Sequence, residues 1–201
     1  MLKTHQPIVP ALLPLDGTGQ RVIWRLAFVA CGVLALAISA KLHVPMWPVP
    51  MTMQTFTVLV IGMVLGPRLG SATLLAYLAL GAMGGNVFSG TTPAGPAYFA
   101  GPTGGYLLGF VIAGWVVGRL ARLGWDRTIP GTAAAMTFGT AIIFSLGLGW
   151  MSHLFAAEHG MGWILATGLW PFLPGAALKI ALAALVVPGL RRMAESRMTD
   201  E

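Results

Sequence analysis

Residues 171–190 read Pro171-Phe-Leu-Pro-Gly-Ala-Ala-Leu-Lys-Ile-Ala-Leu-Ala-Ala-Leu-Val-Val-Pro-Gly-Leu190, an apolar stretch long enough to cross a bilayer. It carries one charge near its middle, on Lys179, and an ammonium at the centre of a membrane helix costs about 3 kcal/mol. The stretch contains no Asp or Glu, so the group that opposes this charge has to come from elsewhere. We expect an anionic ligand to supply it. A lysine paired with backbone carbonyls, or one that extends to the membrane interface, is the alternative.

The composition of the whole chain is equally apolar. Of its 201 residues, 56% are hydrophobic and 9% are charged, and its mean hydropathy is +0.79. Because soluble domains carry about 25% charged residues, these values indicate an integral membrane protein, and the length suits one domain. The net charge is +6, but the basic residues fall at the ends of apolar segments, so no nucleic-acid partner is expected. A single cysteine, Cys31, excludes an internal disulfide.

Six apolar segments predict an all-α integral membrane protein, a bundle of six transmembrane helices. They cover residues 22–40, 51–65, 69–83, 106–120, 133–151 and 170–190. With six crossings, every Lys and Arg other than Lys41 and Lys179 falls at one side of the membrane. Because cytoplasmic loops are enriched in Lys and Arg, both termini are expected in the cytoplasm. This divides the chain into a tail (1–21), a six-helix membrane domain (22–190) and a second tail (191–201).

The two loops expected at the outer face are rich in proline and glycine. Loop one (41–50) contains three prolines, and loop two (84–105) contains Gly-Gly, Pro-Ala-Gly-Pro and Gly-Pro-Thr-Gly-Gly. Irregular backbone near membrane depth is tolerated where it lines a cavity. A conducting channel, a ligand pocket with a lid and ordinary exposed loops all fit this pattern, and the length of loop two favours a functional role.

A stripe of small residues runs along the first apolar segment. Its members recur every four residues: Ala27, Cys31, Ala35 and Ser39. Small side chains at this spacing let another membrane helix approach closely. The stripe predicts either packing inside the bundle or a docking face for another subunit.

Several kinds of chemistry lack the residues that they need. The four histidines lie in the N-terminal tail or the outer loops, and there is no cysteine pair, so neither a metal site nor a cofactor is expected. The chain has no Gly-x-x-x-x-Gly-Lys-Ser/Thr loop for ATP. An intramembrane protease needs a serine and a base within the helices, and no segment interior supplies a histidine. Every Asp and Glu lies outside the six segments, so carboxylate-coupled ion transport is not expected.

Four motifs carry a resemblance to a known family. They are Pro48-Val-Pro-Met-Thr-Met-Gln-Thr-Phe56, Leu65-Gly-Pro-Arg-Leu-Gly70, Gly101-Pro-Thr-Gly-Gly-Tyr-Leu-Leu-Gly-Phe110 and Pro171-Phe-Leu-Pro-Gly-Ala-Ala-Leu-Lys179. In this order they resemble the BioY family, the biotin-specific S components of energy-coupling-factor (ECF) transporters.

The resemblance implies a substrate-binding subunit of the bacterial inner membrane and not an enzyme. Biotin would bind near the outer face under loop one, which includes Lys41 and Val49, and would then be delivered inward. Import would use a transmembrane T component and two cytoplasmic ATPases, or a homo-oligomer if the chain acts alone. The small-residue stripe resembles the face by which S components meet the T component.

Biotin chemistry assigns expected roles to individual residues. Its carboxylate needs a cation in a low-dielectric pocket, which Lys179 supplies through a charge-assisted hydrogen bond. Its fused thioether ring needs apolar walls, and the candidates are Met46, Trp47, Phe88 and Trp170. Its ureido group needs both donors and acceptors, and the candidates are Gln54, Asn86, Thr103 and Tyr106.

One position departs from the family pattern. The resemblance implies an aspartate three residues before the lysine, where it would share a helix face with it, but this chain has Ala176. We expect either that ligand binding is weakened or that another polar group substitutes. This departure leaves two alternatives open, an S component for another small vitamin and a membrane interaction protein that does not transport.

Overall fold

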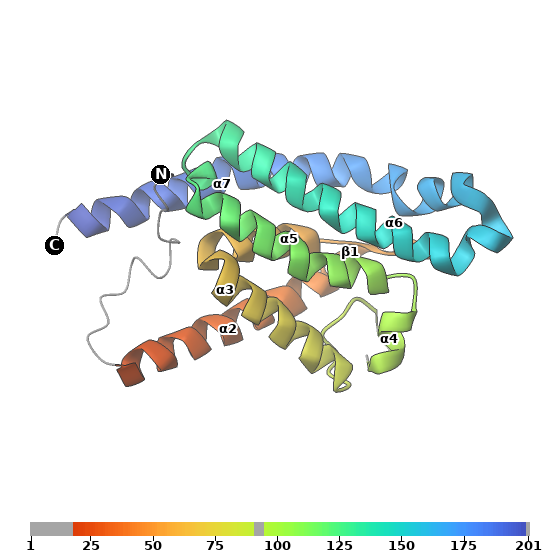
Figure 1. Ribbon diagram of the computed structural model, residues 1–201, viewed down its shortest axis with the longest axis horizontal. Helices are drawn as coiled ribbons and strands as arrows, with labels where there is room; N and C mark the ends of the chain where they lie inside the picture. Colours follow the sequence, from red (N-terminus) through yellow and green to blue (C-terminus); the bar gives the residue numbers. More distant parts are fainter. Residues whose placement is uncertain (1–17, 91–94, 200–201) are drawn as a thin grey trace.

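The computed structural model describes residues 18–90 and 95–199, and it is almost entirely helical (Figure 1). The long helices are α2 (Thr18–Lys41), α3 (Gln54–Ala82), α5 (Gly104–Arg122), α6 (Ile129–Gly168) and α7 (Leu173–Thr199). The short elements are α4 (Pro96–Ala100), η1 (Trp125–Arg127), η2 (Trp170–Phe172) and an antiparallel pair of strands, β1 (His43–Val44) and β2 (Met51–Thr52).

Helix α3 is a hairpin of two helices, as the short Gly66-Pro67-Arg68 turn predicts. Gly66 has φ 79° and ψ 177°, a conformation that glycine adopts without a steric penalty. A Cβ built on Gly70 would lie 3.2 Å from the Cα of Gly62, although eight residues of straight helix span about 12 Å. The two halves of α3 therefore fold back against each other.

Helix α6 also reverses, and here the structure corrects the sequence reading, which left residues 152–169 as a loop. Gly160 has φ 73°, and residues 161–168 form a short helix that packs back on the end of α6. The ring of Trp163 stacks on His159 with centroids 4.3 Å apart and meets Phe155 at 5.7 Å. Aromatic contacts across the reversal thus give this segment a packing partner that hydropathy alone does not reveal.

Length and hydropathy mark four candidate membrane spans among the described residues, Gly19–Lys41, Gln54–Ala82, Gly104–Arg122 and Ile129–Ser196. The second and fourth are composite, because they contain the reversal at Gly66 and the α6–η2–α7 connection. The apolar helices suit a membrane protein, while six crossings and the side on which the termini lie stay predictions.

The expected tails are only partly described. Residues 1–17 and 200–201 lie outside the described residues, as do residues 91–94 of loop two. Helix α2 begins at Thr18 and α7 continues to Thr199, so residues 191–199 of the expected second tail are helical.

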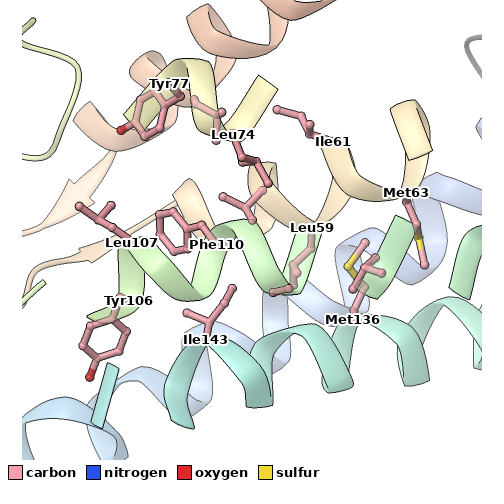
Figure 2. Close-up of a cluster of buried hydrophobic side chains, with 14 of the residues drawn as sticks. Leu59, Ile61, Met63, Leu74, Tyr77, Tyr106, Leu107, Phe110, Met136 and Ile143 are labelled. Atoms are coloured by element: carbon pink, nitrogen blue, oxygen red, sulfur yellow. The ribbon is translucent and has the colours of Figure 1, made fainter. Parts of the chain in front are cut away.

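The core lies where α3, α5 and α6 meet, and Figure 2 shows its buried side chains, among them Leu59, Phe110, Met136 and Ile143. Glycine lets α3 and α5 approach closely, because a Cβ on Gly62 would come within 2.5 Å of the carbonyl oxygen of Gly114. This packing supports the first halves of α3 and α5, and in Figure 1 the start of α5 lies beside α4.

Candidate ligand-binding site

A cavity lies between the start of α3, loop two, α5, α6 and α7. Its volume is about 60 Å³, several times the roughly 10–15 Å³ that one water molecule needs. Apolar side chains form most of the wall: Val49, Phe56, Leu59, Phe88, Leu107, Phe110, Met136, Ile143, Phe144, Phe172 and Ile180. Polar side chains contribute the rest: Thr52, Gln54, Thr55, Ser89, Tyr98, Thr103, Tyr106, Thr140 and Lys179. An apolar pocket with a few converging polar groups is typical of a small-molecule site.

Lys179 is the only Lys or Arg among the described residues that line the cavity. Its Nζ donates hydrogen bonds to the backbone carbonyl of Thr52 and, at 3.1 Å, to Oγ1 of Thr55. Among the described residues no carboxylate forms an ion pair with it. An ammonium has three N–H donors, so two neutral acceptors hold the lysine while its charge and one donor are left for a ligand.

Ala176 lies on the same wall, one helical turn before Lys179. The polar groups beside the lysine come from β2 and the first turn of α3 instead of from α7 itself. Of the two outcomes expected for the missing aspartate, the geometry matches the second, in which another polar group holds the lysine. The sequence analysis gave pairing with a backbone carbonyl as the alternative to a ligand, and this contact is present. No carboxylate among the described residues neutralises the charge of Lys179 beside it.

Gln54 belongs to a buried hydrogen-bond chain and is only 4% exposed. Its Nε2 donates to the hydroxyl of Tyr77 at 2.6 Å, and its Oε1 accepts from Oγ1 of Thr52 at 3.2 Å. The hydroxyl of Tyr77 in turn donates to the carbonyl of Val87 at 2.8 Å. The first turn of α3 is thus tied both to its own second half and to loop two.

The other predicted site residues that reach the cavity are Thr103 and Tyr106, at the start of α5, and Val49 and Phe88. The hydroxyl of Tyr106 donates to the carbonyl of Gly168 at 2.8 Å, which joins α5 to the short helix after Gly160. Its oxygen keeps lone pairs that can accept a hydrogen bond.

Asn86 does not line the cavity, because its side chain is bound by Lys41. The Nζ of Lys41 donates to Oδ1 of Asn86 at 2.7 Å and to the carbonyls of Phe88 and Gly90 at 2.8 and 3.0 Å. All three donors of the ammonium are therefore used on loop two. Lys41 fastens loop two to the end of α2.

Three of the expected apolar wall residues also lie outside the lining of this cavity. Trp47 is 72% exposed and meets the ring of Trp163 at 5.6 Å, Trp170 is 60% exposed, and Met46 is half-buried elsewhere. Of the loop-one residues between the two strands, Val49 and Pro50 line the cavity, and aromatic side chains, Phe110, Phe144 and Phe172 among them, form the wall where Met46 and Trp47 were expected.

Sequence reasoning did not find Ser89, Tyr98 or Thr140. A polar residue inside an apolar segment was a usable signal for Thr140. Ser89 and Tyr98 lie in loop two, where their mutual hydrogen bond of 3.0 Å is visible only in the folded chain.

The small-residue stripe lies mostly on the surface. Ala27, Cys31 and Ala35 are exposed on α2, whereas Ser39 is buried and its Oγ donates to the carbonyl of Leu36 at 2.8 Å. Internal packing accounts for Ser39, and the other three residues form an open face.

Comparisons with known proteins identify the family. A model of the BioY family matches residues 14–196. The probable biotin transporter BioY of Pyrococcus horikoshii is 33% identical over 82% of this chain and 94% of its own length. The biotin transporter BioY of Thermotoga maritima is 32% identical over 81% and 92%.

A solved structure is similar over nearly the whole chain. The crystal structure of the S-component for biotin from an ECF-type ABC transporter aligns with a TM-score of 0.76 and 27% identity, covering 89% of this chain and 95% of that chain. The family match, the relatives and the shared fold confirm the resemblance drawn from the four motifs, and the chain belongs to the BioY family.

Proposed function

We propose that the protein is the biotin-binding S component of an ECF-type transporter, and that it captures biotin in the cavity and delivers it inward. The observation that carries this proposal is the position of Lys179, a cation without a carboxylate partner among the described residues, on the wall of an apolar cavity. The carboxylate of biotin is the counter-charge that such a site lacks. Relatives named biotin transporters and a similar biotin S component support the choice of vitamin.

The cavity wall offers a partner for each part of biotin. With its carboxylate on Lys179, the ureido ring has hydrogen-bonding partners in Gln54, Thr103 and Tyr106, and the thioether ring has the aromatic wall. Lys41 and Val49 belong to loop one, which is the lid in this proposal: Lys41 fastens it to Asn86 of loop two, and Val49 lines the cavity.

The remaining parts of the proposal concern the setting. The chain lies in the bacterial inner membrane with six crossings and both termini in the cytoplasm, and it associates with a T component and two ATPases, or with copies of itself. ATP hydrolysis belongs to those ATPases, so this subunit is not an enzyme. The exposed stripe of Ala27, Cys31 and Ala35 supports a docking role for α2.

Equilibrium binding of biotin to the detergent-purified protein tests the function. We expect a sub-micromolar Kd for the parent chain and a loss of at least about 100-fold in Lys179→Ala, because a charge-assisted hydrogen bond in a desolvated site is removed. Arg192→Ala, which removes an exposed cation outside the cavity, is the matched control and should bind normally. Absence of binding by the parent chain, or equal binding by Lys179→Ala, would contradict the proposal. Other vitamins in the same assay test the rival S-component assignment.

A further inference from the structure

Tyr77 is fully buried and does not belong to the cavity wall. It lies on the second half of α3, beside Leu74 in the core (Figure 2). Its hydroxyl has two partners, Nε2 of Gln54 at 2.6 Å and the carbonyl of Val87 at 2.8 Å. A buried tyrosine needs a partner for its hydroxyl, but one partner is sufficient, and here the second partner is a residue of the cavity wall.

The protons in this chain of hydrogen bonds can be assigned by elimination. The carbonyl of Val87 can only accept, so the hydroxyl proton of Tyr77 points to it. Toward Gln54 the same oxygen can then only accept, which requires the NH₂ group of the amide on that side. The Oε1 of Gln54 accordingly lies on the side of Thr52, whose hydroxyl donates to it. Tyr77 thereby determines which way the Gln54 amide faces.

The fixed amide keeps one donor and one acceptor unused. A primary amide has two N–H groups and two carbonyl lone pairs. Tyr77 takes one N–H and Thr52 takes one lone pair, and no hydrogen bond among the described residues uses the others. A cyclic urea, with an N–H beside a C=O, offers the complementary acceptor and donor.

We propose that Tyr77 is a positioning residue for ligand recognition: it orients the Gln54 amide so that its remaining N–H and carbonyl face the ureido ring of the ligand. This inference rests on the proposed function, because the cyclic urea is the ureido ring of biotin. The same hydroxyl ties Val87, and with it the neighbouring wall residue Phe88, to the second half of α3. Tyr77 therefore holds two residues of the cavity wall, Gln54 and Phe88, in position relative to each other.

The test compares Tyr77→Phe with the parent chain, since this change removes only the hydroxyl and keeps the ring that packs on Phe88 with centroids 5.3 Å apart. We expect biotin binding to weaken about tenfold, the effect of one lost hydrogen bond that no longer holds a polar group in place. Thr73→Val is the matched control. It removes another buried hydroxyl of α3, one that donates to the carbonyl of Leu69 and does not reach Gln54, and it should leave binding unchanged.

Two ligand analogues distinguish a lost orientation of the Gln54 amide from a general destabilisation of the protein. Iminobiotin replaces the ureido carbonyl oxygen with a nitrogen, so the parent chain should strongly prefer biotin, and Tyr77→Phe should reduce that preference about tenfold. Biotin carboxamide alters only the end bound by Lys179, and its penalty should be the same in both proteins. In a Gln54→Ala background, Tyr77→Phe should cause a clearly smaller loss of biotin binding, because only the part that acts through Val87 and Phe88 remains.

A thermal-unfolding cycle of Tyr77→Phe and Gln54→Ala without ligand distinguishes failure of this inference from failure of the proposed function. Coupling between the two changes, together with the altered analogue preference, supports the positioning role. If the effects of the two changes were additive in both unfolding and binding, the positioning role of Tyr77 would be overturned, while the proposed biotin-binding function would stand. A parent chain that does not bind biotin would overturn the function and, with it, the assignment of the ureido ring.

Discussion

At the scale of single residues, Thr55 supplies a hydrogen-bond acceptor for Lys179, whereas Ala176 has none. Its hydroxyl lies 3.1 Å from Nζ of Lys179, and together with the carbonyl of Thr52 it holds the ammonium at the cavity wall. Neither group carries a charge, so the lysine is oriented without being neutralised. A carboxylate ligand therefore meets a full positive charge in a low-dielectric site, where the attraction is stronger than in water.

Thr55→Val tests this role. We expect biotin binding to weaken about tenfold, because a hydrogen bond to a charged group is lost. In an Ala176→Asp background the loss should be clearly smaller, since an aspartate one turn away on α7 can hold Lys179 instead. Equal losses in the two backgrounds, measured by equilibrium binding, would show that Thr55 does not stand in for the missing carboxylate.

At the scale of elements, an ionic cluster of Asp126, Arg127, Arg191 and Glu195 joins η1 to the end of α7. Asp126 is fully buried with Arg191 at 3.6 Å, and Arg191 lies 2.9 Å from Glu195, which also pairs with Arg127. Burial raises the pKa of the Asp126 carboxyl, and the Arg191 guanidinium opposes that rise. The cluster is attached to the helix that carries Lys179, so it contributes to the placement of α7.

Arg191→Met should destabilise the protein by about 3–5 kcal/mol, because it leaves a buried carboxylate without its counter-charge. Since a raised pKa in the folded state means that stability falls as pH rises, the penalty should be larger at about pH 8 than at about pH 5. Adding Asp126→Asn should restore part of the loss and remove the pH dependence. The readout is the temperature at which half of the detergent-purified protein stays monodisperse; a pH-independent penalty would contradict the account.

The two reversals differ in how far they follow from sequence. Gly66 is followed by Pro67 and Arg68, a breaker and a charge between two apolar segments, and this local chemistry predicts the hairpin of α3. Gly160 lies near Glu158 and Gly162 but is not followed by a proline. The helix beyond it is held by the rings of Phe155, His159 and Trp163. A turn that is set by its own residues can be predicted from the sequence, whereas a turn that depends on packing between side chains cannot.

At the scale of the whole molecule, the cavity and the exposed face of α2 are separate surfaces. Ala27, Cys31 and Ala35 are open, and large apolar side chains such as Leu34 and Ile38 are exposed beside them. In a membrane such a face meets either lipid or another helix. If a partner subunit docks there, binding of biotin and its transport are separable properties.

Ala35→Trp tests that separation. We expect biotin binding by the isolated subunit to stay within about threefold, while biotin uptake by cells that also express the partner subunits falls at least about tenfold, because a bulky side chain blocks close helix approach. Ala141→Trp, at an exposed position of α6, is the matched control and should transport normally. Unchanged uptake in Ala35→Trp, or equal losses in both variants, would remove α2 as the docking face.

The sequence by itself determined the membrane class, the helical fold, the family and the central cation, because hydropathy, charge placement and short motifs are local properties of the chain. It also identified Gln54, Thr103, Tyr106 and Lys179, which the fold brings to one cavity. Only the tertiary structure decided which neighbours they meet. Thr52 lies 127 residues from Lys179 in the chain, and Lys41 lies 45 from Asn86. Contacts over such separations arise from how the helices pack, and no local pattern encodes them.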